Sequence, residues 1–388
     1  MDSYINESDA RIMFHIAVNL LYLRPGEVGG SEEYVKQLFG SLARNKDIRL
    51  TLFCFDMAEH AIRSAIRDAD VKVLAKAPYS TGKRLRSENV LMPLLSKRHK
   101  FDVLVNPANF GSLHTFGLAP QVTVIHDLQH LHFPEFFSLK TRFARNHFIR
   151  KSVANSRYII AISEFTRKDI VNHLGANPSD VQTIHEGVVI TTPSLEKRRA
   201  VRKQYCLFEQ YLIYPAMIAP HKNHEIIIRA LSVLRKRLCR PMGLVFTGSN
   251  RAAFGSLEKI AERLGVGDSV RHLGHIPRED VIAVIAESKA LVFPSLFEGF
   301  GQPVLEAQFL GVPVIVSNAA SLPEVTGAGG VQLPPYSVQA WAEAISRVLD
   351  DELFRRGLIQ SGIENVKRFS WEKCAEETLR VLRLAAKT

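Results

Sequence analysis

The chain has 388 residues, of which 46% are hydrophobic and 23% charged, with a net charge of +11 and a pI near 9.5. This length exceeds the ~250–300 residues at which a single hydrophobic core stops growing, so we expect two domains of ordinary globular composition. No run of about 18 apolar residues occurs, which excludes a transmembrane helix, and the positive charge indicates an anionic partner such as a nucleotide, a nucleic acid or a membrane surface.

The N-terminal residues 1–11 are polar and acidic and lack the basic segment of a signal peptide, so we expect residues 12–18 to form a first strand. The four cysteines show neither a CxxC motif nor metal-ligand spacing. They are Cys54, Cys206, Cys239 and Cys374. We therefore expect free thiols in a reducing cytoplasm.

The first half of the chain alternates short β-branched runs with amphipathic helical stretches. This order is typical of a parallel sheet covered by helices. We predict strands at residues 14–18, 49–55, 71–75, 103–106, 122–126, 158–163 and 181–184. Between residues 190 and 196 the pattern gives way to Thr-Thr-Pro-Ser, which indicates a linker.

A glycine-bearing loop at residues 24–33 follows the first strand and leads into a helix. Gly29 and Gly30 permit close approach of the backbone, and Ser31 is a good helix N-cap with Glu33 in the first turn. The pattern is not GxGxxG, so a nicotinamide site is poorly supported. Two interpretations stay open, a capped turn and a contact to a phosphate or an acceptor.

Basic residues flank the apolar segment 90–95, at positions 83–86 and 97–100. A second basic stretch, residues 140–151, also contains two phenylalanines. Such helices occur on anionic membrane surfaces and equally as solvated helices, so both interpretations remain. No nucleic-acid-binding motif accompanies the charge, and we expect no nucleic-acid partner.

His126 and Asp127 end a predicted strand, so both fall at the carboxyl edge of the sheet, where this architecture binds its ligands. His130 and His132 follow, and three histidines so close raise the question of a metal. No carboxylate or thiolate with ligand spacing accompanies them, so we expect no metal site.

A second alternating series begins after the linker. Its predicted strands are residues 211–214, 243–247, 270–273, 290–293, 312–317 and 330–333, and residues 371–386 should form an amphipathic helix. We therefore expect an α/β protein with two doubly wound domains that bind ligands in a shared cleft. The expected boundaries are 1–195, 196–368 and a C-terminal helix at 369–388 that crosses back to the first domain.

Three residues of the second series lie at strand or helix ends. Lys222 stands before a helix predicted at residues 225–238, where its charge would complement a diphosphate. A solvated surface lysine is the alternative. Gly248 and Gly274 end two strands, and each would let a nucleotide base or a sugar approach closely.

The most informative loop follows the predicted strand at 290–293. Its glycines and Pro303, at the start of the next helix, favour a phosphate through backbone N–H groups and the helix dipole. Two carboxylates, Glu298 and Glu306, bracket the loop. Because a carboxylate beside a phosphate is costly, we expect each to accept hydrogen bonds from hydroxyl groups, such as those of a sugar ring.

Together these residues resemble family 4 glycosyltransferases of the group 1, mannosyltransferase-like kind. The resemblance runs in order along nearly the whole chain. It rests on residues 298–306, 311–318 and 322–324, on Lys222-Asn223 and on His126-Asp127-Leu128. It implies the GT-B fold, two Rossmann-like domains that face a central cleft. It also implies sugar transfer from a nucleotide-sugar with retention of configuration, and without an obligatory metal or other cofactor.

The resemblance also implies roles for individual residues. Glu306 would bind the nucleotide ribose, and Glu298 the hydroxyl groups of the donor sugar. Lys222 would neutralise the diphosphate leaving group, and His126 would contact the donor sugar near the reacting carbon. The other expected donor contacts are Gly30, Gly248, Gly299, Phe300, Gly301 and Leu305.

One position departs from the family pattern. Many members carry arginine five residues before the lysine, where this chain has Met217. Losing that bidentate donor would weaken diphosphate binding unless His221 or another basic residue replaces it.

We expect a cytoplasmic enzyme that moves a sugar, with mannose as a first guess, to a glycan or lipid-linked acceptor in bacterial surface polysaccharide synthesis. A peripheral contact with an anionic inner membrane stays open. The alternatives are a catalytically silent nucleotide-sugar sensor or scaffold and a sugar-nucleotide epimerase on the same fold.

Overall fold

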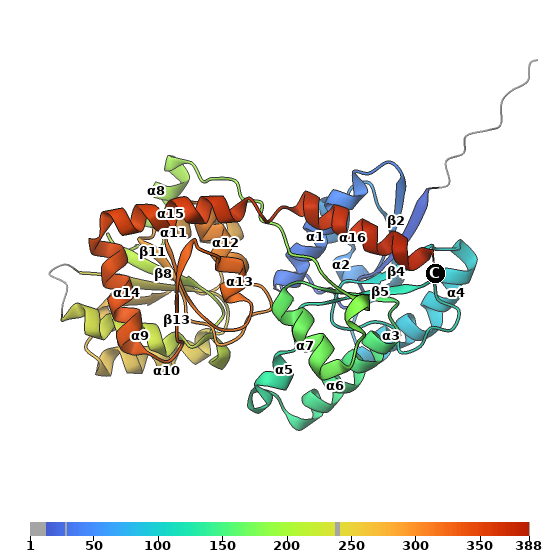
Figure 1. Ribbon diagram of the computed structural model, residues 1–388, viewed down its shortest axis with the longest axis horizontal. Coiled ribbons are helices and arrows are strands. Elements are labelled where there is room, and N and C mark those ends of the chain that lie inside the picture. The colour runs from blue at the N-terminus through green and yellow to red at the C-terminus, as the bar shows by residue number, and fades with distance from the viewer. Residues whose placement is uncertain (1–12, 28, 237–240, 388) are drawn as a thin grey trace, which may run out of the picture.

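The computed structural model describes residues 13–27, 29–236 and 241–387. Two sheets stand side by side, each with helices packed against it (Figure 1). The predicted α/β class, with two doubly wound domains, is confirmed.

The first sheet contains seven strands in the described part of the chain, and all of them are parallel. They are β1 (Phe14–Asn19), β2 (Ile48–Phe55), β3 (Asp70–Ala75), β4 (Val103–Asn106), β5 (Gln121–Ile125), β6 (Tyr158–Ala161) and β7 (Val181–Thr183). Their spatial order is β3-β2-β1-β4-β5-β6-β7. The order reverses between β1 and β4, so the loops that leave these strands diverge and open a crevice.

The helices of this half are α1 (Gly30–Ala43), α2 (Asp56–Ala65), α3 (Thr81–Arg86), α4 (Met92–His99), α5 (Gln129–His132), α6 (Leu139–Ala154) and α7 (Glu164–Leu174). A π-helical turn (Ser87–Leu91) joins α3 to α4. The prediction that Ser31 caps the first helix is wrong. Gly29, with φ of 61°, is the N-cap, because only glycine enters this conformation without strain, and Ser31 already lies inside α1.

The second sheet contains six parallel strands among the described residues. They are β8 (Tyr211–Pro215), β9 (Gly243–Thr247), β10 (Val270–His272), β11 (Ala290–Phe293), β12 (Val314–Ser317) and β13 (Gly330–Leu333). Their order is β10-β9-β8-β11-β12-β13, so the reversal lies between β8 and β11. The loops after these two strands open the second crevice.

The remaining helices are α8 (Leu195–Gln204), α9 (His224–Arg235), α10 (Arg251–Arg263), α11 (Arg278–Glu287), α12 (Gln302–Phe309), α13 (Leu322–Thr326), α14 (Val338–Asp350), α15 (Glu352–Val366) and α16 (Trp371–Ala386). Helix α8 belongs to the second half, since Lys197 pairs with Asp280 of α11 at 2.6 Å. The predicted linker at residues 190–196 therefore ends at the start of α8.

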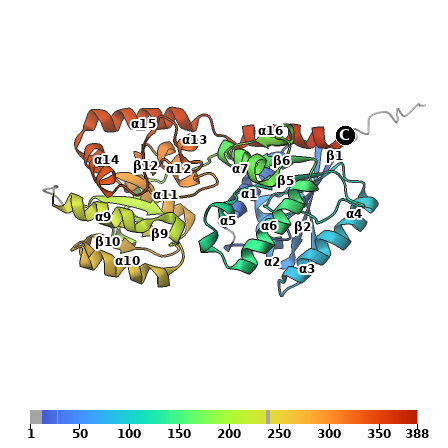
Figure 2. The same ribbon diagram turned by 60° about the horizontal axis from the view of Figure 1, so that its bottom comes forward.

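The last helix returns to the first sheet. Figures 1 and 2 show α15 over the second domain and α16 beside α1 over the first. The Trp371 ring lies 5.8 Å from the Tyr34 ring of α1, and Val381 and Leu382 are buried in the same core as β1 and β2. The first domain therefore completes its core with the end of the chain.

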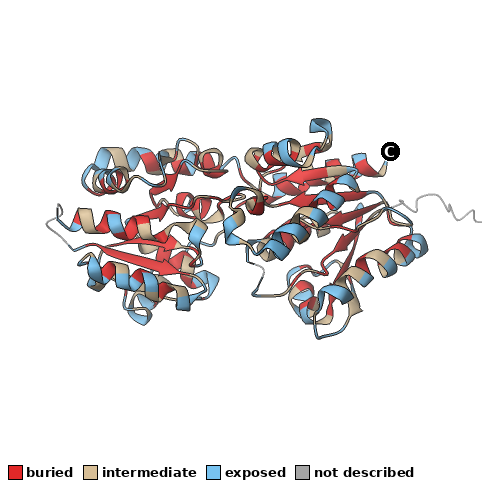
Figure 3. Cartoon of the chain, turned by 90° about the horizontal axis from the view of Figure 1, so that it is seen from below, coloured by how far each residue is buried: buried red, intermediate tan, exposed pale blue. Residues whose placement is uncertain are grey.

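Burial follows the strands in both halves, as Figure 3 shows. One apolar core surrounds the second sheet, and another surrounds the first sheet together with α16. Phe300 and Leu305, from the second half, belong to the core of the first. Within the described residues, no helix combines the length and the apolar character that a membrane crossing needs.

Every predicted strand is confirmed, with ends that shift by at most two residues. The strand predicted at 312–317 begins at Val314, because Pro313 has no N–H for the sheet. Of the helix predicted at 225–238, residues 237 and 238 lie outside the described part, as do residues 1–12 and Cys239. Cys54, Cys206 and Cys374 are free thiols, as predicted.

Candidate active site

The candidate site lies where loops at the carboxyl ends of both sheets face each other. A cleft of about 610 Å³ separates them, and its walls come from both domains. The loops after β1, β5, β8 and β11 all contribute, and three of these strands flank the two points of order reversal. This is the position at which open α/β sheets bind ligands.

Most of the predicted site residues meet in this cleft. They are Gly30, His126, Lys222, Glu298, Gly299, Phe300 and Gly301. Gly248, Leu305 and Glu306 do not line it. Gly248 lies behind the wall, where an added Cβ would fall 2.7 Å from Met217 N. Leu305 is fully buried in the first core, so its side chain supports the loop and does not face the cleft.

One serine supports the loop after β11. Ser321 Oγ lies 2.9 Å from the carbonyl oxygens of both Glu298 and Phe300. Gly301 follows with φ of 111° and is the N-cap of α12, with Pro303 in the first turn as predicted. The amino end of α12 therefore lies at the cleft, where its free N–H groups and dipole favour an anion.

Lys222 and Glu298 form an ion pair across the second crevice. Their Nζ and Oε1 atoms lie 2.6 Å apart, and the side chains are 14% and 13% exposed. Lys222 comes from the loop after β8 and Glu298 from the loop after β11. A cation and a carboxylate thus stand side by side at one wall of the cleft.

Glu306 is covered by a residue that the sequence analysis did not single out. Its carboxylate is 4% exposed and lies 2.8 Å from Arg278 Nη2, at the start of α11. Burial raises the pKa of Glu306, whereas the Arg278 charge opposes that effect. The Arg278 side chain itself is 50% exposed, so it covers Glu306 from the solvent side.

Gly299 brings the second domain against the backbone of the first. A Cβ at this position would lie 2.1 Å from the carbonyl oxygen of His126 and 3.4 Å from Asp127 Cβ. Real Cβ contacts do not occur below 3.0 Å. The cleft therefore closes at its base only because residue 299 has no side chain.

Burial favours the neutral form of the His126 ring, and one hydrogen bond holds the ring in one tautomer. Its Nε2 lies 3.1 Å from the carbonyl oxygen of Pro107, which can only accept, so Nε2 carries the hydrogen. Burial lowers the pKa of His126. Nδ1 is then an acceptor, and Glu186 Oε1 lies 3.9 Å from it. A neutral ring here suits contact with a sugar hydroxyl.

Glu186 joins the two domains at the floor of the cleft. Its Oε2 accepts a hydrogen bond of 2.8 Å from Gln302 Nε2, which also donates to the Gly187 carbonyl at 2.9 Å. Burial raises the pKa of Glu186 to about 7. Glu186 follows the end of β7, as His126 follows the end of β5, so its position after a strand could have identified it from the sequence.

Replacing Glu186 by glutamine is expected to flatten the pH dependence of stability. The folded carboxyl keeps its proton up to about pH 7, whereas the unfolded carboxyl releases it near 4.5. Its contribution to folding is therefore fully present below pH 4.5 and is lost as the pH rises towards 7. By scanning calorimetry, Glu186→Gln should raise the Tm more at pH 8 than at pH 5.

Burial also raises the pKa of Glu88 to about 7, so the stability of the variant should still fall somewhat as the pH rises. An equal change in Tm at both pH values would contradict the assignment of this slope to Glu186.

The missing arginine is not replaced by His221. Burial and the neighbouring Lys222 charge lower the pKa of His221 to about 4, so its ring is uncharged at neutral pH. Met217 lines the cleft and is 47% exposed. Arg24, Arg84 and Arg145 line the cleft on the side of the first domain.

The three histidines that raised the question of a metal are separated by the fold. His126 faces the cleft, whereas His130 is buried, 3% exposed, with neither ring nitrogen hydrogen-bonded. Only His132 joins potential metal ligands, Asp169 and His173 of α7. The sequence analysis missed this group because the two α7 residues lie far along the chain.

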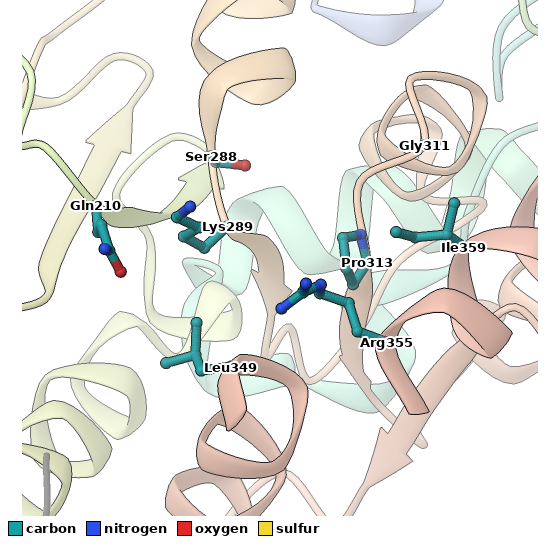
Figure 4. Close-up of a pocket in the computed structure, with 8 residues that line it drawn as sticks. All are labelled: Gln210, Ser288, Lys289, Gly311, Pro313, Leu349, Arg355 and Ile359. Atoms are coloured by element: carbon teal, nitrogen blue, oxygen red, sulfur yellow. The ribbon is translucent and has the colours of Figure 1, made fainter. Parts of the chain in front are cut away.

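A second pocket, of about 270 Å³, lies at the amino ends of the second sheet (Figure 4). Three of its residues each stand directly before a strand: Gln210 before β8, Lys289 before β11 and Pro313 before β12. Arg355 and Ile359 of α15 complete it. None of the predicted site residues lies here, and the pocket stands at the opposite strand ends from the cleft.

Two protein-family models match the chain. The model described as Glycosyltransferase Family 4 matches residues 28–191, and the model described as Glycosyl transferases group 1 matches residues 202–365. The chain belongs to glycosyltransferase family 4. The cleft of this family 4 enzyme lies between its two matched halves, and its activity is that of a glycosyltransferase.

Two curated relatives of this family 4 glycosyltransferase are from Escherichia coli. O-antigen chain mannosyltransferase B is 28% identical over 286 residues, which are 73% of this chain and 74% of that protein. The serotype-specific mannosyltransferase WbdA is 32% identical over 227 residues, 56% of this chain but only 27% of WbdA. The matched part of this chain therefore corresponds to about a quarter of WbdA, which is the longer protein.

A solved structure shows the same fold. Anabaena HepE in complex with UDP-glucose superposes with a TM-score of 0.76 at 18% identity, over 95% of this chain and 99% of that one. The predicted GT-B fold of this family 4 glycosyltransferase is confirmed.

Proposed function

We propose that this family 4 glycosyltransferase transfers mannose from a nucleotide-sugar to a glycan or lipid-linked acceptor in bacterial surface polysaccharide synthesis, with retention of configuration. The proposal rests on one observation, that the same cleft is lined by Lys222, Glu298 and His126. The names of the two Escherichia coli relatives support mannose as the sugar, and the name of the first supports a polysaccharide acceptor.

The proposed reaction depends on stabilising the leaving group. Departure of a diphosphate from the anomeric carbon leaves an oxocarbenium-like centre, so the main demand is to neutralise the departing charge. In the proposed complex Lys222 turns from Glu298 towards the diphosphate, and the N–H groups around Gly299 and Gly301 also face that charge. Glu298 then accepts hydrogen bonds from the sugar hydroxyls, and Glu306 from the ribose. No metal or other cofactor takes part in the proposed step.

A donor screen tests the proposal. The purified full chain is incubated with GDP-mannose and with UDP-sugars, each with and without oligosaccharide or lipid-linked acceptors, and nucleoside diphosphate release is measured. We expect release from GDP-mannose that depends on the acceptor, and a product with the anomeric configuration of the donor by NMR. Release from no donor would contradict the proposal, and an altered nucleotide-sugar without acceptor would identify an epimerase.

One observation favours a second candidate. Met217 stands where many family members carry an arginine, and His221, the neighbour of Lys222, is uncharged at neutral pH. A sensor or scaffold that binds a nucleotide-sugar without turnover would tolerate this loss. Calorimetric binding without transfer would favour the sensor, whereas loss of transfer in Glu298→Gln with retained nucleotide binding would exclude it.

The proposal includes a peripheral contact with an anionic membrane. Apolar side chains stand exposed next to basic residues, Leu94 (62%) on α4 and Leu139 (78%) and Phe143 (76%) on α6. The chain should sediment with phosphatidylglycerol vesicles and not with phosphatidylcholine vesicles. Absence from the phosphatidylglycerol pellet would refute the contact.

A further inference from the structure

Three potential metal ligands converge beside the donor cleft, in a group that sugar transfer does not use. Asp169 and His173 lie four residues apart on α7, so both side chains stand on one face of that helix. His132 is the last residue of α5. The ligand atoms of the three residues all lie within 4.8 Å of one another.

Both imidazoles present Nε2 to the same carboxylate. His132 Nε2 lies 2.6 Å from Asp169 Oδ2, and His173 Nε2 lies 3.8 Å from Asp169 Oδ1. The Asp169 side chain is 9% exposed, whereas His132 and His173 are 31% and 47% exposed. The carboxylate therefore forms the floor of the group, and the solvent side stays open for an ion and a water molecule.

We propose that His132, Asp169 and His173 bind a divalent first-row transition metal ion, for which zinc is the probe. Two imidazoles and one carboxylate are a donor set that such ions take in proteins, with water at the open position. In a tetrahedral site with bonds of ~2.0–2.1 Å, ligand atoms stand about 3.3 Å apart. The two contacts to Asp169 would each change by less than about 1 Å, and the ion would replace the proton that His132 and Asp169 share.

The position of the group gives the metal a supporting role. The His132 ring packs against Phe165 of α7 at 5.6 Å and against Phe297 of the second domain at 5.1 Å. Phe297 directly precedes Glu298 in the loop after β11. The metal joins α5 to α7 and fixes the imidazole on which the loop after β11 rests.

Metal titration of the full chain tests the site. The protein is stripped with EDTA, dialysed and titrated with Zn²⁺ by calorimetry, without any nucleotide-sugar. We expect one tightly bound ion per chain. His132→Ala and His173→Ala should each weaken binding by at least about tenfold, since even outer-shell partners of a metal contribute that much.

His60→Ala is the matched control, because His60 is an exposed histidine on α2 that the proposal does not use. It should bind zinc as the wild type does. Both test positions are partly exposed, so their variants should fold, which circular dichroism checks. Absence of stoichiometric binding, or unchanged affinity in both test variants, would overturn the proposal, whatever the outcome of the donor screen.

Discussion

Replacing Lys222 by alanine is expected to lower kcat for sugar transfer by roughly 10²–10³-fold, the typical loss when one preorganised donor to a developing negative charge is removed. Lys222 is the cation that pairs with Glu298 in the cleft, at 2.6 Å. With Met217 in place of the arginine and His221 uncharged, its loop offers no second charge to replace it. Steady-state release of nucleoside diphosphate measures the loss.

Lys289→Ala is the matched control. It removes the same charge from the same domain, at the opposite strand ends (Figure 4), and should leave kcat unchanged. Lys222→Ala also leaves the nearly buried Glu298 unpaired, so its Tm should fall. The double variant Lys222→Ala/Glu298→Gln should recover the Tm without recovering activity. Wild-type kcat in Lys222→Ala would refute the leaving-group role.

Adding one methyl group at Gly299 is expected to reduce kcat/KM by about 100-fold or more, because displacements of about 1 Å at a reacting centre have effects of that size. The new Cβ would lie 2.1 Å from the His126 carbonyl oxygen, which belongs to the other domain. Both atoms are attached to rigid backbone, so the domains must move apart. Transfer kinetics with the donor identified by the screen measure the effect.

Gly357→Ala controls for the methyl group itself. Gly357 lies on α15 with no atom within 4 Å of its added Cβ. Alanine there should leave kcat/KM unchanged and stabilise the helix slightly. If Gly299→Ala transfers sugar as fast as Gly357→Ala, the closed arrangement of the two domains is not the active one.

The fold could be predicted because its signals are local. Alternating apolar runs and helical periods indicated both sheets, and parallel order follows from the helices between strands. The same reasoning found His126, Lys222 and Glu298, since each stands in the segment that follows a strand, and parallel strands gather their carboxyl ends at one edge. The residues that follow the strand ends therefore predicted where the cleft lies.

The remaining features depend on pairs far apart in sequence. Arg278 covers Glu306 from another helix, and Asp169 meets His132 from another helix. No local sequence pattern predicts such a contact. The N-cap prediction for Ser31 was wrong for a local reason. Helix α1 begins two residues earlier than predicted, after Gly29, whose positive φ a residue preference for serine does not reveal.

In the proposed complex, Glu306 holds the nucleotide and Glu298 holds the sugar. Calorimetric titration with GDP, or with the nucleoside diphosphate of the donor that the screen identifies, separates these two roles, because this ligand lacks the transferred sugar. We expect Glu306→Gln to weaken binding by about tenfold, as a charge-assisted hydrogen bond becomes a neutral one. Glu298→Gln should bind the diphosphate at least as tightly as the wild type does, because Lys222 no longer has to leave an ion pair. Equal losses in both variants, or a loss in Glu298→Gln alone, would contradict this division of roles.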